Sequence, residues 1–233
     1  MRSSVPFRLA LVAALLSAAS LFAQQPAELP PVHVPVKPVN RRDLDHVEAL
    51  KAYALGVVAE HDNRLIEAVK HYEEAARLDP DAAAPLRALA PLYVALDRSD
   101  DALDACRKAL QLDPEDANTG YFYARQLRAA GKIPEAVAVF ARTAGLPGLK
   151  DKPGLRLPIL LDMGAVCETA GDLKKAEAAF RDAIAVLDKP DVLMEQEPIS
   201  RAEIDGQAAE IDERLARLCL KDGRPDQAAA DFE

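Results

Sequence analysis

Residue types that commonly perform chemistry are sparse in this sequence of 233 residues. Its four histidines show neither an i, i+4 pair nor the spacing of a zinc site: His33, His46, His61 and His71. The sequence contains no GxSxG, no Walker-type GxxxxGKS/T and no glycine-rich phosphate loop. Its many Asp and Glu residues could in principle supply an acid–base pair, but we interpret them as solvated charge on the outward faces of helices. We assign no catalytic, cofactor-binding or metal-binding residue and expect a protein that is not an enzyme.

Composition favours helices and argues against nucleic acid as a ligand. Half of the residues are apolar and only 5% are aromatic, and the apolar bulk is Ala and Leu, the best helix formers. The 29 basic and 38 acidic residues give a net charge of −9, whereas phosphate binding requires clustered Lys and Arg. We expect an all-α protein that binds no nucleic acid.

Three columns of residues repeat along the chain in one register. Small residues recur at spacings of 34, 34, 40 and 52, at Gly56, Ala90, Ala124, Gly164 and Ala216. Twelve residues after each of these stand Ala68, Ala102, Ala136, Ala176 and Ala228. Four residues further on stand Tyr72, Cys106, Phe140, Phe180 and Phe232. Such columns are typical of helical hairpins, because a small residue on each helix lets its partner approach.

Turn and stop signals keep the same register. Residues suited to positive φ lie where the first helix of each hairpin must end, at Asn63, Asp97, Gly131, Gly171 and Gly223. The second helix is expected to end at Asp79–Pro80 and again at Asp113–Pro114, because proline cannot continue a helix and disfavours helical geometry in the residue before it.

These features together resemble the tetratricopeptide repeat family. The family's pattern of a large–small pair, Ala, an aromatic residue, Ala and a terminal Pro is matched by Leu55–Gly56, Ala68, Tyr72, Ala75 and Pro80. The second unit repeats the pattern with Cys106 in the aromatic place, and no unit has the family's Trp. The resemblance implies a right-handed α-solenoid of stacked antiparallel helix hairpins over residues 43–233. Its units lie near 49–82, 83–116, 117–146, 157–188 and 209–233, the last incomplete.

Two insertions separate the later units. Residues 145–156 hold two prolines and three glycines, which predicts a loop between the third and fourth units. In the second insertion, residues 189–208, Ser200 followed by Glu203 forms a capping box. This pair predicts that the first helix of the fifth unit starts early, near Arg201.

The two ends of the array carry different signals. Asp43 is expected to cap an extended first helix. At the other end, Glu233 falls at the 25th place of a 34-residue unit, so Ala228 and Phe232 would lack a neighbouring helix. We expect the native gene product to continue past Glu233, with self-association through this C-terminal end as the alternative.

The three cysteines occupy inward repeat positions, where a thiol behaves as a small apolar residue. They are Cys106, Cys167 and Cys219. We expect buried thiols without a disulfide, since Cys167 and Cys219 hold equivalent places on helices that pack about 8–10 Å apart.

The resemblance also implies a concave groove, lined by the first helices of successive units, that binds a peptide or a partner protein. The predicted groove residues are Tyr53, Val57, Arg87, Tyr121, Arg125, Arg128, Leu161 and Glu168. The cations with which some family members grip a peptide's terminal carboxylate are missing. Tyr53, Tyr121, Arg87, Arg125 and Arg128 instead form an aromatic and cationic patch of the residue types enriched at binding hot spots, with ordinary surface charge as the alternative interpretation.

The N-terminus has the features of a secretory signal. Arg2 and Arg8 precede a 14-residue apolar stretch, residues 9–22, which is shorter than the roughly 20 residues of a membrane span. We predict a signal peptide over residues 1–23 that is cut after Ala23, with a cut after Ser20 or a retained anchor as alternatives. A proline-rich, extended linker is expected over residues 24–42.

The sequence therefore predicts a non-catalytic scaffold that is periplasmic or secreted and has no membrane span after signal cleavage. Its partner is a protein or peptide, bound without a cofactor. The first alternative is that the chain is the recruiting N-terminal portion of a larger enzyme or cell-envelope assembly component that continues beyond Glu233. A self-assembling structural array is the second.

Overall fold

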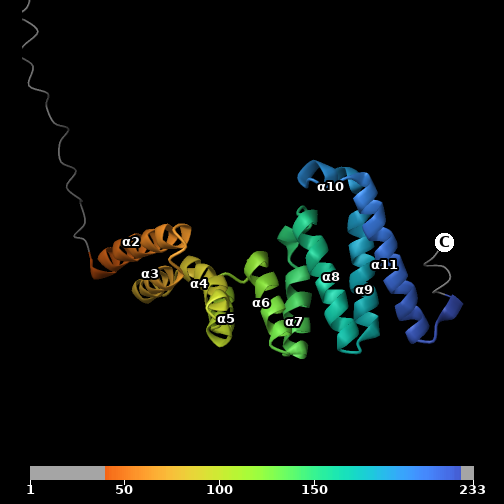
Figure 1. Ribbon diagram of the computed structural model, residues 1–233, viewed down its shortest axis with the longest axis horizontal. Coiled ribbons are helices and arrows are strands. Elements are labelled where there is room, and N and C mark those ends of the chain that lie inside the picture. Colours follow the sequence, from red (N-terminus) through yellow and green to blue (C-terminus); the bar gives the residue numbers. More distant parts are fainter. Residues whose placement is uncertain (1–39, 227–233) are drawn as a thin grey trace, which may run out of the picture. The chain divides into compact units, whose positions relative to one another are not determined.

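A computed structural model describes residues 40–226, and every element in that range is a helix (Figure 1). The elements form antiparallel hairpins: α2 (Arg41–His61) with α3 (Leu65–Leu78), α4 (Ala83–Ala95) with α5 (Ser99–Leu112), α6 (Ala117–Ala129) with α7 (Ile133–Ala144), and α8 (Pro153–Thr169) with α9 (Leu173–Leu187). The short α10 (Pro190–Gln196) leads to α11 (Arg201–Lys221), which packs on α9. The predicted fold class, an all-α solenoid of stacked helix hairpins, is confirmed.

Some of the sequence predictions lie outside the described residues. They are the signal peptide, the linker up to residue 39, and the last inward positions of the fifth unit, Ala228 and Phe232. Helix α2 begins at Arg41, two residues before the predicted cap. Asp43 lies in the first turn of α2, where its negative charge interacts favourably with the positive end of the helix dipole.

The repeating columns form the contacts inside each hairpin. The four described alanines of the second column, Ala68, Ala102, Ala136 and Ala176, are fully buried. The residues four places further on, three aromatic side chains and Cys106, are 1% exposed or less. A Cβ added to Gly56 would lie 2.6 Å from the Tyr72 ring, and one added to Gly164 would lie 2.6 Å from the Phe180 ring. The glycines therefore permit a helix separation that no side chain would allow.

Gly120 has a comparable role in the third hairpin. It stands near the start of α6, where Asp116 caps the helix by accepting hydrogen bonds from the backbone N–H groups of Asn118 and Thr119. A Cβ on Gly120 would lie 2.5 Å from the Thr143 hydroxyl oxygen of α7. Close packing on α7 explains why a poor helix former occupies this place.

The predicted turns between the two helices of each hairpin are confirmed. All five residues have positive φ: 59° at Asn63 and Asp97, 73° at Gly131, 78° at Gly171 and 72° at Gly223. In each case the next backbone N–H donates to a carbonyl five residues earlier, as Arg64 does to Ala59 at 2.8 Å. This bond satisfies a carbonyl that the end of the helix would otherwise leave open. The second helices also stop as predicted, with Asp79 and Asp113 at the C-caps.

The two insertions hold more helix than the sequence predicted. The expected loop at 145–156 is wrong for its last four residues, because α8 already begins at Pro153, a residue that suits the first position of a helix. Its first half contains a 3-10 turn, η1 (Pro147–Leu149), that buries Leu149. In the second insertion, α10 was not predicted. The start of α11 at Arg201 is confirmed, with the capping box of Ser200 and Glu203 in place.

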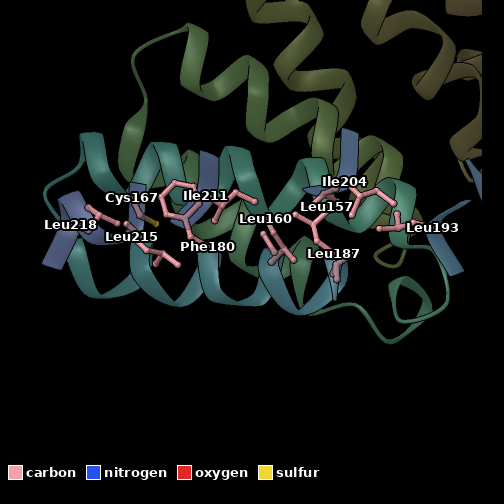
Figure 2. Packing of buried hydrophobic residues seen from close by; sticks show 13 residues of the cluster. Leu157, Leu160, Cys167, Phe180, Leu187, Leu193, Ile204, Ile211, Leu215 and Leu218 are labelled. Carbon is pink, nitrogen blue, oxygen red and sulfur yellow. The ribbon is translucent and has the colours of Figure 1, made fainter. Parts of the chain in front are cut away.

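The apolar core at the C-terminal end gathers side chains from four helices. Figure 2 shows Leu157 and Leu160 of α8 and Phe180 of α9 among the leucines and isoleucines of α11, with Leu193 of α10 beside them. Leu193 is 2% exposed. This burial explains why the unpredicted α10 forms, since the helix places Leu193 over the ends of α8, α9 and α11.

The three cysteines are buried thiols, as their inward positions predicted. Cys106, Cys167 and Cys219 are each 0% exposed. Burial raises the pKa of Cys106 to about 12, so this thiol is protonated and a poor nucleophile at neutral pH.

Replacing Gly164 by Ala is expected to lower the free energy of unfolding by about 1–3 kcal/mol, because the added methyl group would overlap the buried Phe180 ring. Gly206, inside α11, offers a matched control, since a Cβ there meets no atom within 4 Å. Gly206→Ala should raise the free energy of unfolding by about 0.5–1 kcal/mol. Urea unfolding followed by circular dichroism measures both, and stabilisation by Gly164→Ala would contradict the packing role.

Candidate protein-binding surface

Two clefts separate first helices of successive hairpins. One, of about 440 Å³, lies between α4 and the start of α6, and its lining includes Arg87, Pro91, Asn118 and Phe122. The other, of about 270 Å³, lies between α8 and α11 and is lined by Leu161, Asp162, Ala165, Gln207, Glu210, Ile211 and Arg214. Of the predicted groove residues, Arg87 lines the first cleft and Leu161 lines the second.

Asp162 on α8 organises the residues of the predicted patch that belong to α6. Its carboxylate accepts a hydrogen bond from the Tyr121 hydroxyl at 2.9 Å and another from the Arg128 guanidinium at 2.9 Å. The Arg125 Nε lies 3.8 Å from the same carboxylate, and its guanidinium stands 5.6 Å from the centre of the Tyr121 ring. One carboxylate thus holds three of the predicted groove residues together.

These partners differ in how accessible they are. The side chain of Asp162 is 24% exposed and that of Arg128 is 38% exposed, whereas Arg125 is 54% exposed. Burial, reinforced by the hydrogen bond to Asp162, raises the pKa of Tyr121 above its ordinary value. Tyr121 is therefore a neutral hydrogen-bond donor at physiological pH, and Arg125 is the most accessible cation of the group.

Arg87 pairs with a different group of carboxylates. Its guanidinium lies 3.2 Å from Asp113 and 3.2 Å from Asp116. Although burial opposes the effect, hydrogen bonds from Thr119 and Arg87 hold the pKa of Asp116 below its ordinary value. Arg87 therefore braces the start of α6 as well as lining the cleft beside α4.

The two predicted groove residues on α2 have unlike environments. Tyr53 is half-buried, and its ring centre lies 5.3 Å from that of Tyr72. Val57 is 45% exposed. The first hairpin thus offers an apolar surface, in contrast to the charged surface of the third.

The remaining predicted residues, Leu161 and Glu168, lie on α8. Leu161 lines the cleft between α8 and α11. Glu168 forms an ion pair with Lys221 at the end of α11. Both contacts form despite the insertion before α11, because α11 packs on α9 as the first helix of a further hairpin would.

Comparison with known proteins agrees with the helical-repeat fold. The family profile described as "Tetratricopeptide repeat" matches residues 52–82 and 88–116. Residues 52–82 and 88–116 are therefore tetratricopeptide repeats. The comparison with curated proteins found no match to this sequence.

Solved structures of repeat proteins share the fold. The structure of MamA has a TM-score of 0.59 at 16% identity, over 79% of this chain and 88% of MamA. YrrB, described as "a TPR protein with an unusual peptide-binding site", has a TM-score of 0.55 at 18% identity, over 78% of this chain and 82% of YrrB. PilF of Pseudomonas aeruginosa has a TM-score of 0.50 at 19% identity, over 82% of this chain and 90% of PilF.

The repeat pattern alone missed several residues of this surface. Asp162, one place after the predicted Leu161, is the hub of the α6–α8 contacts, and Gln207, Glu210 and Arg214 add the wall that α11 contributes. The residues on α11 were missed although Ala216 fixes the repeat register of that helix, because the predicted groove residues come only from the first four units.

Two searches of the described residues bear on other kinds of site. Between residues 40 and 226 no three His, Cys, Asp or Glu side chains are grouped in a way that would hold a metal ion. In the same range no helix has the length and apolar character that crossing a membrane requires.

Replacing Asp162 by Asn is expected to lower the free energy of unfolding by about 1 kcal/mol, a value discounted for the partial exposure of the carboxylate. The control is Asp205→Asn, which removes an ion pair to Arg201 that is 61% exposed on the Asp side and should change stability by less than about 0.5 kcal/mol. Urea midpoints of the two variants measure the difference. Equal midpoints would show that Asp162 is ordinary surface charge.

Proposed function

We propose that this chain is an exported, non-catalytic scaffold that binds a peptide or a partner protein across the first helices of its repeats. The observation that carries the proposal is the set of contacts around Asp162. This carboxylate fixes Tyr121 and Arg128 by hydrogen bonds and leaves Arg125 the most exposed of the three. An arginine held beside a tyrosine ring is a residue pair that is enriched at binding hot spots.

The repeats favour binding because little of the surface must be ordered when a ligand arrives. Each first helix is fixed by the small–large contacts of its own hairpin, so its outward residues hold their places before binding. Pre-organisation of this kind reduces the conformational entropy lost on association. Fold alone does not assign function, but YrrB has this fold and is described as having a peptide-binding site.

The charges indicate which kind of ligand suits the centre of the surface. Two guanidinium groups, those of Arg125 and Arg128, face the single carboxylate of Asp162. This leaves one positive charge locally on a chain whose net charge is −9. An acidic side chain of an extended peptide is therefore the expected partner of Arg125, and apolar side chains are expected in the cleft beside Leu161 and Ile211.

Replacing Arg125 and Arg128 together by Ala is expected to weaken peptide binding about tenfold or more, since a hot-spot arginine contributes roughly 1–2 kcal/mol. Peptides selected from a displayed library against the wild-type chain serve as probes, with affinity measured by fluorescence anisotropy. The matched control is Arg107→Ala with Arg142→Ala, which removes the same charge from the cleft between α5 and α7. Equal losses from both pairs would show non-specific attraction, and no loss from the first pair would dispose of the proposal.

Export is the second part of the proposed function, and it rests on the sequence of residues 1–23. The basic residues Arg2 and Arg8, the 14 apolar residues that follow and Ala23 have the order of a cleaved signal. Cleavage would leave the repeats attached to the proline-rich linker in an extracytoplasmic compartment.

The N-terminus of the protein recovered from the extracytoplasmic fraction is expected to be Gln24. Ala23→Arg should block this cleavage, because small residues are required next to the cut, while Ala27→Arg, beyond the cut, should leave it unchanged. Mass spectrometry of the intact protein distinguishes the outcomes. A product beginning at Leu21 would indicate the alternative cut after Ser20, and an uncut protein in the membrane fraction would indicate a retained anchor.

A further inference from the structure

Helix α2 carries an unusual concentration of exposed apolar side chains. Six of the eleven large apolar residues that are exposed among the described residues lie on it: Leu44, Val47, Leu50, Leu55, Val57 and Val58. They fall on two faces of the helix. At 100° per residue, Leu50 and Val57 lie on the predicted groove face, together with Tyr53. The other four lie on a separate strip, which also contains Lys51 and which we call the end face.

The end face corresponds to positions that the later hairpins cover, fully on α4 and α11 and in part on α6, where Tyr123 and Gln126 are half-buried. The repeat register relates Lys51, Leu55 and Val58 to residues on α4, α6, α8 and α11. The counterparts of Lys51 are all buried, at Pro85, Thr119, Ile159 and Ile211. On α4 the counterparts of Leu55 and Val58 are Leu89 and Leu92, which are 2% and 5% exposed. On α11 they are Leu215 and Leu218, which are 2% and 1% exposed.

The burial of these positions has a simple origin. In the later hairpins a preceding second helix lies against the first helix, as α3 lies against α4 and α7 against α8. On α2 the same positions are open, with Leu55 and Val58 each 53% exposed. The end face of α2 therefore has the composition of a helix–helix interface, and it is exposed in the described part of the chain.

We propose that the end face is a self-association surface, on which α2 of a second copy of this chain packs antiparallel about a two-fold axis at Lys51. This inference stands independently of the proposed peptide groove. It concerns a different face of α2, which is the first described helix of the array.

The spacing of the apolar residues allows a second copy of the same helix to be the occupant. Leu44 and Val58 each lie seven residues from Lys51, and Val47 and Leu55 each lie four residues from it. An antiparallel pair of identical helices centred on Lys51 therefore sets Leu44 opposite the second copy's Val58 and Val47 opposite its Leu55. A two-fold interface requires this self-complementarity. If one residue contacts a second residue of the other copy, the same contact must form with the two copies exchanged.

Charge complementarity supports the same arrangement. Glu48 lies one turn from Lys51 on α2, and the two side chains form an ion pair of 2.7 Å. In the antiparallel pair, Glu48 of each copy also lies within reach of the second copy's Lys51. The two ammonium groups at the axis are thus matched by two carboxylates, which avoids repulsion between like charges.

The chain's own residues before α2 are a weaker candidate for the same surface. In the later hairpins a helix covers these positions. Prolines at 26, 30, 31, 35 and 38 make a helix in that stretch unfavourable. A second copy supplies the helix that the preceding sequence does not predict.

Sedimentation velocity of the full chain over a range of concentrations tests the proposal. One helix pair covers less surface than the roughly 800 Å² per partner of a standard interface, so a dimer with micromolar affinity is expected. Val47→Glu with Leu55→Glu should raise the dimer dissociation constant at least tenfold. The matched control is Leu50→Glu with Val57→Glu, which adds the same charge to residues of similar exposure on the groove face of the same helix and should leave dimerisation unchanged.

A thiol crosslink tests the position of the two-fold axis. The native cysteines are fully buried, so a cysteine placed at Lys51 is the residue that a short bis-maleimide reaches in the folded protein. Lys51→Cys should give a covalent dimer, and Leu50→Cys, one residue away on the groove face, should not. Circular dichroism of each variant confirms that the helices are intact.

Three results would overturn the proposal. The first is a wild-type chain that stays monomeric throughout the micromolar range, as it would if residues 1–39 cover the end face within one molecule. The second is a dimer that the Leu50 and Val57 pair disrupts while the Val47 and Leu55 pair does not. The third is equal crosslinking at positions 50 and 51.

Discussion

A contact between a small residue on one helix and a large side chain on the next sets the spacing of this structure. Gly56 lies against the Tyr72 ring and Gly164 against the Phe180 ring, so closely that a methyl group would overlap each ring. Because side-chain volume decides how near two helices come, this contact fixes each hairpin. The stacking of one hairpin on the next follows, since it uses the faces that remain. A repeat array is therefore held by nearest-neighbour contacts rather than by one central core.

The same constraint explains where the chain can bind other molecules. Residues that face the partner helix are buried by packing. Only the faces outside the hairpin contact are therefore available to bind another molecule. On α6 and α8 such a face brings Tyr121, Arg125 and Arg128 to the carboxylate of Asp162. On α2 two such faces are exposed, the one beside Tyr53 and the one centred on Lys51. The proposed binding surface and the proposed self-association surface thus lie on different faces of helices that share one periodic pattern.

The two insertions leave the packing inside the neighbouring hairpins unchanged. Between α7 and α8 the chain forms η1 and buries Leu149, and between α9 and α11 it forms α10 and buries Leu193. Each insertion therefore contributes an apolar side chain to the core beside it. The hairpin contacts on either side are preserved, as the burial of Ala176 and Phe180 shows, and the first helix of the next unit keeps its place.

The sequence by itself determined the helical hairpins, their turns at Asn63, Asp97 and the three glycines, and the residues that pack inward, because all of these depend on local backbone preference and on a periodic pattern of side-chain size. It also placed Tyr121, Arg125 and Arg128 on one face. Only the tertiary structure decided that Asp162 joins them while Arg87 pairs with Asp113 and Asp116. It alone revealed α10 and the wall from α11. Ion pairs and helix docking across a variable insertion depend on distances between separate repeats, and the pattern within a repeat does not contain those distances.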